Sequence, residues 1–203
     1  QSLASDLIGG GNVGQPQLVI FALPTNELDE VLNREFKLNP QSTFMDVGSV
    51  KNEVLLKVEG VAGLASRFVP SHPMAGREIG GAGSARADLF QGRSWVITPI
   101  SQTSSESLQT VEALIALLGA TALKMSPADH DAAVAKVSHL PQIVSSLLAK
   151  QLMGTKQEWM ELSGQGLRDS TRIAGSDAHL WKEIIFSNRQ VLSGLLKGLR
   201  DDV

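Results

Sequence analysis

Short apolar runs alternate with amphipathic stretches along the first half of the chain. Two strand-then-helix units follow each other directly, with strands expected at 17–23 and 43–47 and helices at 26–36 and 49–58. The first run is continuously apolar rather than alternating, so both faces of that strand should be buried. Thr25 and Ser49 stand where the two helices would begin, as N-caps do. The pattern predicts a parallel sheet covered by helices, an α/β fold.

The period of the pattern changes at residue 126. Before it, strands are expected at 67–70, 94–98 and 121–125, with a helix over 108–118 that ends at Gly119. Ser126 supplies a cap, Pro127 a first-turn proline and Asp129 an acid near the start of a long helix. No strand-like run returns after that, and helices are expected at 128–153, 158–164 and 180–199. The chain therefore divides into an α/β domain over 1–125 and an all-α domain over 126–203.

The helical domain carries more apolar side chains than a small bundle buries by itself. Those of the last helix recur roughly on one face, at Leu180, Ile184, Val191, Leu195 and Leu199. Small bundles bury too little surface alone, and a large exposed apolar face marks an interaction site. We expect a homodimer that forms through this domain.

Composition and charge exclude several classes of protein. The formal net charge is −3 and the basic residues are scattered, so neither nucleic acid nor a membrane is an expected partner. The chain has no cysteine, which rules out disulfides and thiolate metal ligands. No window approaches the roughly 18 apolar residues of a membrane span, and the start lacks the pattern of a secretory signal. A cytoplasmic protein is expected.

The glycine-rich segment 9–14 matches the dinucleotide fingerprint G-x-G-x-x-G by its letters only. The fingerprint binds a pyrophosphate when a strand leads into the turn and a helix begins directly after it. Here a weakly helical segment comes first, and Gln15 and Pro16 lead into a strand. We interpret the segment as a flexible loop, and we expect the fingerprint of a dinucleotide-binding domain to lie before Gln1.

Two stretches of the α/β half are hard to explain by packing. The turn 45–51 joins a strand end to a helix start, where ligands bind in open α/β sheets, although Ser49 acting only as a cap is the plain alternative. The loop 70–76 holds His72 between two prolines. A fixed histidine suits general acid/base catalysis because its pKa lies near neutrality, whereas a lone loop histidine is more often simply solvated.

The helical half adds a third group of candidate residues. His139 precedes Pro141, which frees backbone carbonyls and kinks a helix, a feature often found beside functional sites. Arg168, Asp169 and Arg172 lie within a helical turn of one another. They could present a guanidinium to a carboxylate with Asp169 holding the geometry, and a surface ion-pair cluster is the alternative.

Other chemistries find no support in the sequence. A metal site is not expected, because His130 and His139 are nine residues apart, out of phase on a helix, with no third nitrogen ligand nearby. The G-x-S-x-G elbow of serine hydrolases and the G-K-[ST] of P-loop proteins do not occur.

Three motifs together resemble the prephenate/arogenate dehydrogenases of tyrosine biosynthesis. They are Ser71-His-Pro-Met-Ala-Gly76, Ser138-His-Leu-Pro-Gln142, and Asp169-Ser-Thr-Arg172 followed by Trp181 and Asn188. With the strand end at 23–25 and the turn 46–51 they occur in the family's order, so the resemblance covers essentially the whole chain. It implies an α/β Rossmann-like N-terminal domain that is incomplete at its start, followed by an all-α helical dimerisation domain.

The resemblance also implies a reaction and the residues that carry it. The family oxidises and decarboxylates prephenate or arogenate with hydride transfer to NAD or NADP. By resemblance, His72 assists removal of the ring hydroxyl proton and Ser49 lies at the junction of nicotinamide and substrate. Substrate contacts are implied for Arg172, His139, Arg77, Asp169 and Trp181, and cofactor contacts for Ala22, Leu23, Pro24, Thr25, Asp46 and Ser49.

Two departures from the family pattern leave choices open. Arg77 stands where many members have a smaller polar residue; this version of the loop resembles actinobacterial members and favours arogenate, with prephenate still open. The residue that selects NAD or NADP would lie in the missing first segment, so that preference is open too. The alternative functions are another two-domain hydroxyacid dehydrogenase, for which no catalytic lysine motif is found, and a dimerising or ligand-binding remnant without a cofactor site.

Overall fold

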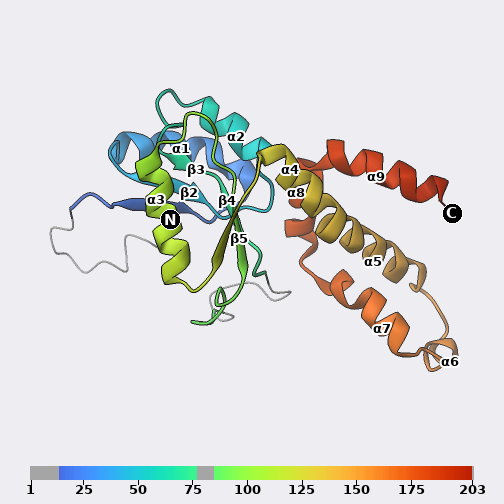
Figure 1. Cartoon of the computed structure of the whole chain (residues 1–203). Helices are drawn as coiled ribbons and strands as arrows, with labels where there is room; N and C mark the ends of the chain where they lie inside the picture. Colours follow the sequence, from blue (N-terminus) through green and yellow to red (C-terminus); the bar gives the residue numbers. More distant parts are fainter. Residues whose placement is uncertain (1–13, 77–84, 203) are drawn as a thin grey trace.

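The computed structural model describes residues 14–76 and 85–202, which form two halves (Figure 1). The first half combines strands and helices and its last strand ends at Lys124, whereas the second half is helical from Pro127 onward. All of the glycine-rich segment except Gly14 lies outside the described residues. The predicted order of an α/β region followed by a helical region is confirmed.

The first sheet has three parallel strands in the order β1-β2-β3. The strands are β1 (Leu18–Phe21), β2 (Thr43–Asp46) and β3 (Phe68–Val69), with Leu18 opposite Thr43 and Phe44 opposite Phe68. The crossovers carry α1 (Leu28–Leu38), which follows a 3-10 turn η1 (Thr25–Glu27), and α2 (Asn52–Glu59). Both predicted strand-then-helix units are therefore present.

The second sheet is mixed, whereas the first sheet has the expected parallel arrangement. β4 (Ser71–Pro73) pairs antiparallel with β5 (Ser94–Ile97), and β5 pairs parallel with β6 (Thr121–Lys124). Parallel neighbours need a crossover, and α3 (Ser105–Leu117) supplies it between β5 and β6. The described part of the connection between β4 and β5 contains turns and no helix.

The strand β2 contributes to two separate cores, because successive strand residues point to opposite faces of a sheet. On one face, Phe44 lies with its ring centroid 6.0 Å from that of Phe21, and both pack against α1 and α2. On the other face, Met45 packs with Trp95 and with side chains of α3. Helices thus cover both faces, which explains why the central strands are apolar at successive positions.

The helical half opens with one long helix that changes its winding in the middle. The segments are α4 (Pro127–Val134), the π-helical turn η3 (Ala135–His139) and α5 (Leu140–Gln151). The Ser126 hydroxyl accepts a hydrogen bond from the Asp129 N–H at 3.0 Å, so the predicted cap is confirmed. In η3 the Leu140 N–H bonds to the Ala135 carbonyl, one residue further back than in an α-helix. The π-helical turn ends two residues before Pro141, which has no N–H to continue the regular pattern.

The remaining helices differ from two predicted spans. They are α6 (Gln157–Met160), α7 (Gln165–Thr171), the 3-10 turn η4 (Arg172–Gly175), α8 (Ala178–Ser187) and α9 (Arg189–Asp201). The helix expected at 158–164 is shorter than predicted, because α6 ends at Met160 and Gly164 is extended as the N-cap of α7. The helix expected at 180–199 is divided at Asn188, whose side chain is held by buried hydrogen bonds.

The caps expected in the α/β half are also wrong. Thr25 lies inside η1, and neither η1 nor α1 has a capping side chain. Ser49 lies three residues before α2, which begins at Asn52 and likewise has no capping side chain of its own. The start of α2 receives its partner from the helical half, as described below.

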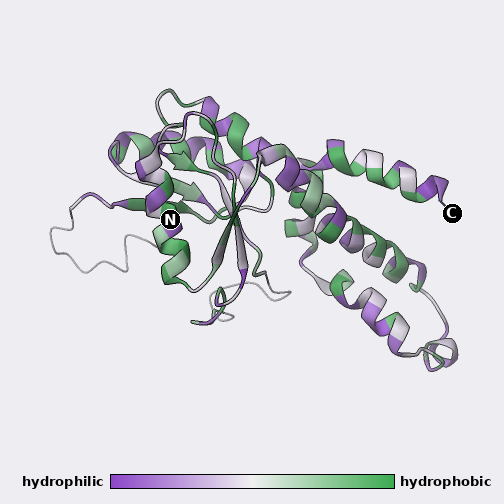
Figure 2. Ribbon diagram, viewed as in Figure 1, coloured by the Kyte–Doolittle hydropathy of each residue, from purple (hydrophilic) through white to green (hydrophobic). Residues whose placement is uncertain are grey.

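Hydrophobic positions recur along the helices of the second half (Figure 2). Several large apolar side chains there are exposed, among them Leu147, Leu180, Phe186 and Leu199. Among the helices of residues 14–76 and 85–202, none is long and apolar enough to cross a membrane.

Candidate active site

A cavity of about 540 Å³ lies where the two halves meet. The α/β half contributes Ser49 and the segment 72–76, and the helical half contributes side chains of η3, α5, η4 and α8. Because neither half encloses this space alone, its shape depends on the contacts that hold the halves together.

His72 lies in the wall of this cavity and belongs to β4, which corrects its expected place in a loop. It stands opposite Val96 of β5, so its backbone is tied to a neighbouring strand. The His72 Nδ1 atom lies 2.9 Å from Nε2 of His130, and the two rings meet edge to face. A side chain placed on a strand and held at one nitrogen is positioned more firmly than one on a loop.

His130 connects His72 to Asp131, which joins the two halves. His130 and Asp131 are buried neighbours on α4, and His130 Nδ1 lies 2.8 Å from the Asp131 carboxylate. That carboxylate also accepts hydrogen bonds from the backbone N–H groups of Lys51 at 2.8 Å and Asn52 at 2.9 Å, and from the Asn52 amide at 2.8 Å. Asp131 therefore caps the start of α2 from the opposite half, with its charge favourably placed at a helix N-terminus.

Lys51 is a buried cation next to the strand that carries His72. Its ammonium forms an ion pair with Asp46 and donates to the Ser71 carbonyl at 2.7 Å. Asp46 in turn accepts the Ser71 N–H at 3.0 Å. Burial lowers the pKa of Lys51, while the carboxylates of Asp46 and Asp131 oppose that shift. A charge buried this deeply is tolerated only when it is paired.

The ionisation of the histidines and of Asp131 is set by burial and by these contacts. Burial, and next to it the positive charge of Lys51, lowers the pKa of His72 to about 3. Burial also lowers the pKa of His139 to about 4. Burial alone would raise the pKa of Asp131, but the hydrogen bonds from His130, Asn52 and Lys51 outweigh it and lower that pKa. At neutral pH the cavity therefore presents two uncharged imidazoles, and Asp131 is ionised.

His139 ends the π-helical turn and lines the same cavity. Asn188 contacts the imidazole ring of His139. The Asn188 Nδ2 atom lies 3.2 Å from His139 Nδ1 and donates to the main-chain carbonyl of Asp131 at 2.9 Å. Trp181 packs edge-on against the imidazole, with ring centroids 6.0 Å apart. The position of the His139 side chain thus depends on η3, which carries it, and on Asn188 and Trp181, which are distant in sequence.

A second cavity, of about 490 Å³, adjoins the first. It lies at the carboxyl ends of β1 and β2 and is lined by residues 22–25, by residues 47–50 and by part of α8. Ser49 lines both cavities and so stands between them. Asp46 is not among the residues that line either cavity, because its carboxylate is buried against Lys51 and Ser71.

None of the arginine group, Arg168, Asp169 and Arg172, is among the residues that line the first cavity. Arg172 begins η4 and is exposed, while the next residue, Ile173, lines the cavity and accepts a hydrogen bond from Gln142 at 2.9 Å. Asp169, on α7, accepts a hydrogen bond from Gln165 at 2.8 Å. Arg77 lies outside the described residues.

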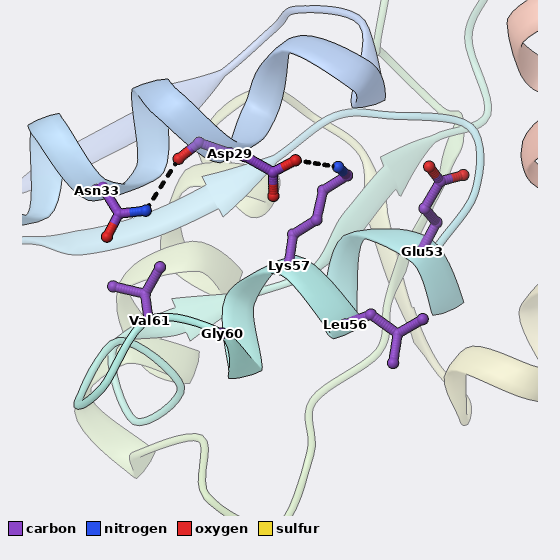
Figure 3. A pocket seen from close by; sticks show the side chains of 7 residues that line it. All are labelled: Asp29, Asn33, Glu53, Leu56, Lys57, Gly60 and Val61. Carbon is purple, nitrogen blue, oxygen red and sulfur yellow. Dashed lines mark hydrogen bonds and ion pairs between the residues drawn. The ribbon is translucent and has the colours of Figure 1, made fainter.

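A hollow between α1 and α2 offers no comparable chemistry (Figure 3). Lys57 forms an ion pair with Asp29 there, and the Asn33 amide donates to the Asp29 carbonyl at 3.1 Å. Lys57, Asp29 and Asn33 satisfy one another, Glu53 keeps one carboxylate oxygen without a hydrogen-bond partner, and none of the described residues that line the hollow is a histidine. The cavity with His72 and His139 is therefore the candidate active site.

The residues that organise the cavity are difficult to find from sequence. His130 stands out there in the run Asp129-His-Asp131 and as a metal candidate, but its partner His72 is 58 residues away. Within the described ranges, no three potential metal ligands gather around a common point. Lys51 and Asp131 look like ordinary surface charges on helices, because nothing local indicates that they are buried. The acid-histidine-acid run at 129–131 is the one available signal.

Together, the fold and the cavity define a two-domain protein with a Rossmann-like half, a helical half and a histidine-lined cavity between them. Residues 10–124 match the family model for the prephenate dehydrogenase nucleotide-binding domain, and residues 126–202 match that for the prephenate dehydrogenase dimerization domain. The chain belongs to the prephenate dehydrogenase family.

Individual relatives agree with this assignment. The prephenate dehydrogenase of Bacillus subtilis is 29% identical over 193 residues, which are 92% of this chain and 51% of that protein. The structure of Aquifex aeolicus prephenate dehydrogenase in complex with hydroxyphenyl propionate and NAD+ aligns with a TM-score of 0.83 at 29% identity, over 93% of this chain and 66% of that one. Synechocystis arogenate dehydrogenase aligns with a TM-score of 0.73 at 28% identity, over 92% and 68%. The chain spans half to two thirds of the length of its curated relatives.

The lowered pKa of His139 makes the stability of the fold depend on pH. The unfolded ring takes up a proton below about pH 6.5, and the folded ring does so only near pH 4, so stability is lost as the pH falls between these values. At about pH 5 this loss should reach about 2 kcal/mol relative to neutral pH. Urea unfolding at one protein concentration measures the free energy of unfolding at pH 7 and at pH 5. In His139→Gln, the decrease between these pH values should be smaller by about 2 kcal/mol. The exposed His179→Gln should behave like wild type; an equal loss in all three proteins would contradict the expectation.

Proposed function

We propose that this chain belongs to an enzyme that oxidises and decarboxylates prephenate or arogenate, with hydride transfer to NAD or NADP. The observation that carries the proposal is the pair of adjoining cavities. One contains His72, the other opens at the strand ends, and Ser49 lines both. The complex of the Aquifex relative with both hydroxyphenyl propionate and NAD+ supports sites for two ligands.

The second cavity fits a nicotinamide dinucleotide. Such cofactors bind at the carboxyl ends of parallel strands in open α/β sheets, and this cavity lies there. Ala22, Leu23 and Pro24 offer an apolar wall for a flat ring, and Thr25 adds a hydroxyl. When bound, the nicotinamide would supply the hydride acceptor. NAD and NADP are both candidates.

In this proposal His72 accepts the proton of the ring hydroxyl. A neutral imidazole with a free lone pair can take that proton as the hydride departs from the same carbon. The low pKa of His72 should rise when a substrate carboxylate enters, because a nearby negative charge favours the imidazolium. Loss of carbon dioxide then makes the ring aromatic, which drives the reaction forward.

The other side chains would bind and orient the substrate. We assign recognition of a carboxylate to Arg172, since it directly precedes the cavity residue Ile173, with Asp169 as its support. His139 and Trp181 would form one wall, and Ser49 would lie at the junction of substrate and nicotinamide. Contact of Arg77 with the substrate side chain stays a prediction from the sequence.

A homodimer and a cytoplasmic location complete the proposal. The helical half matches a dimerization domain, and its exposed apolar side chains, such as Leu147, Phe186 and Leu199, offer a surface to a second copy. The net charge of −3 favours neither nucleic acid nor an anionic membrane as a partner.

The reaction is tested by nicotinamide reduction, followed by its near-ultraviolet absorbance. Prephenate and arogenate are each offered with NAD and with NADP. We expect turnover with at least one of the four pairs, and the active pair identifies both substrate and cofactor. If prephenate or arogenate binds but none of the four pairs gives turnover, the proposal is contradicted and a ligand-binding remnant is favoured.

His72→Asn should lower kcat by roughly two to four orders of magnitude, because the proton acceptor is lost, with little change in substrate affinity. Steady-state kinetics measures the effect, and far-ultraviolet circular dichroism shows whether the variant is folded. Unchanged turnover in a folded variant would remove His72 from the mechanism.

Arg172→Gln should mainly raise KM, by roughly tenfold or more, because a charged contact to a carboxylate is lost in ground and transition states alike. The exposed Arg34→Gln, on α1, is the matched control and should behave like wild type. A normal KM in Arg172→Gln would contradict the assignment.

A further inference from the structure

The hydrogen-bond chain behind the cavity determines which nitrogen of each histidine carries the proton, and it starts at Asp131. The carboxylate of Asp131 receives two backbone N–H groups and the Asn52 amide, so it acts only as an acceptor. His130 Nδ1, 2.8 Å away, must therefore be protonated.

If Nδ1 carries the only proton of the His130 ring, Nε2 has a lone pair. His72 Nδ1 lies 2.9 Å from that atom and must donate to it, so the His72 proton also sits on Nδ1. His72 is then left with an unprotonated Nε2. The ring is oriented as a base before any substrate binds.

The second branch of the chain begins at the main-chain carbonyl of Asp131. That carbonyl can only accept, which orients Asn188 with its Nδ2 toward it at 2.9 Å. The same Nδ2 lies 3.2 Å from His139 Nδ1 and can only donate, so His139 Nδ1 is an acceptor. The proton of His139 therefore sits on Nε2, the reverse of His72.

We propose that Asp131 is the positioning residue of this site: through His130 it holds His72 with a lone pair on Nε2, and through Asn188 it holds His139 with a proton on Nε2. Two uncharged histidines in one cavity then serve opposite purposes. His72 accepts a proton, whereas His139 donates a hydrogen bond to an oxygen of the substrate, a carboxylate or carbonyl. These roles of His72 and His139 toward a substrate rest on the proposed function, whereas the assigned proton positions do not.

The branch to His72 also stabilises the charge that proton uptake creates. When His72 takes a proton on Nε2, its Nδ1–H still donates to His130, and His130 still donates to the ionised Asp131. A buried carboxylate thus faces the new imidazolium through one intervening ring. Because Asp131 also caps α2, the residue that orients the base holds the two halves at the same time.

The proton positions can be measured without substrate by long-range proton–nitrogen correlation spectroscopy of 15N-histidine-labelled protein. The chain has four histidines, and single substitutions assign their signals. We expect protonated Nδ1 on His72 and His130 and protonated Nε2 on His139 at neutral pH. A protonated Nδ1 on His139, or a doubly protonated His130, which would reverse its bond to His72, would overturn the proposal.

Two variants separate the branches. Asn188→Ala should give His139 a mixture of tautomers and raise KM roughly tenfold with kcat nearly unchanged, while the His72 and His130 signals stay in place. Asp131→Asn should disturb the His130 and His72 signals and lower kcat roughly a hundredfold. The matched control Asn33→Ala, on α1, should change no histidine signal. If Asp131→Asn does not fold, the wild-type spectrum and Asn188→Ala still decide.

The outcome is distinguishable from failure of the proposed function. If the expected tautomers are found but no substrate and cofactor pair gives turnover, this inference holds and the proposed reaction is wrong. If turnover is found but the histidine protons lie on other nitrogens, the proposed reaction holds and this inference is wrong. Unchanged His139 signals in a folded Asn188→Ala would show that Asn188 only packs against the ring, and would overturn its branch.

Discussion

The burial of the Asp131 carboxylate against the start of α2 is the interaction on which the rest of the structure depends. It takes an ionised group from the helical half and surrounds it with hydrogen-bond donors of the α/β half and of His130. Removing one partner of a buried charged contact typically costs about 3–5 kcal/mol, because the other group is left unsatisfied. The halves are therefore held in one relative position, and the cavity between them keeps its shape.

The same region contains a second buried charged contact, between Lys51 and Asp46. Asp46 is bonded to Ser71, the residue before His72, and the Lys51 ammonium donates to the Ser71 carbonyl. The pair thus holds the backbone of β4 at Ser71, while His130 holds the imidazole ring of His72. Burying these charges contributes little to stability by itself, because desolvation offsets the attraction. What the arrangement provides is a base whose position and protonation are settled before a substrate arrives.

Backbone irregularity appears where the two halves present side chains to the cavity. The chain leaves the first sheet at Pro70 and pairs in the opposite sense in β4, and the long helix of the second half forms a π turn that ends at His139. The α8–α9 junction, at Asn188, supplies the third irregular point. Each departs from what local propensity favours, and each is maintained by hydrogen bonds to residues distant in sequence.

The sequence by itself determined the order and type of most elements, because apolar period and cap residues such as Ser126 act over a few positions. Through the motifs around His72 and His139 it also indicated the family. Only the tertiary structure decided the mixed sheet, the division of the last helix, and the contacts that link His72 through His130 to Asp131. These depend on burial and on pairs up to 80 residues apart. A charged residue that will be buried looks, in sequence, the same as one that remains in solvent.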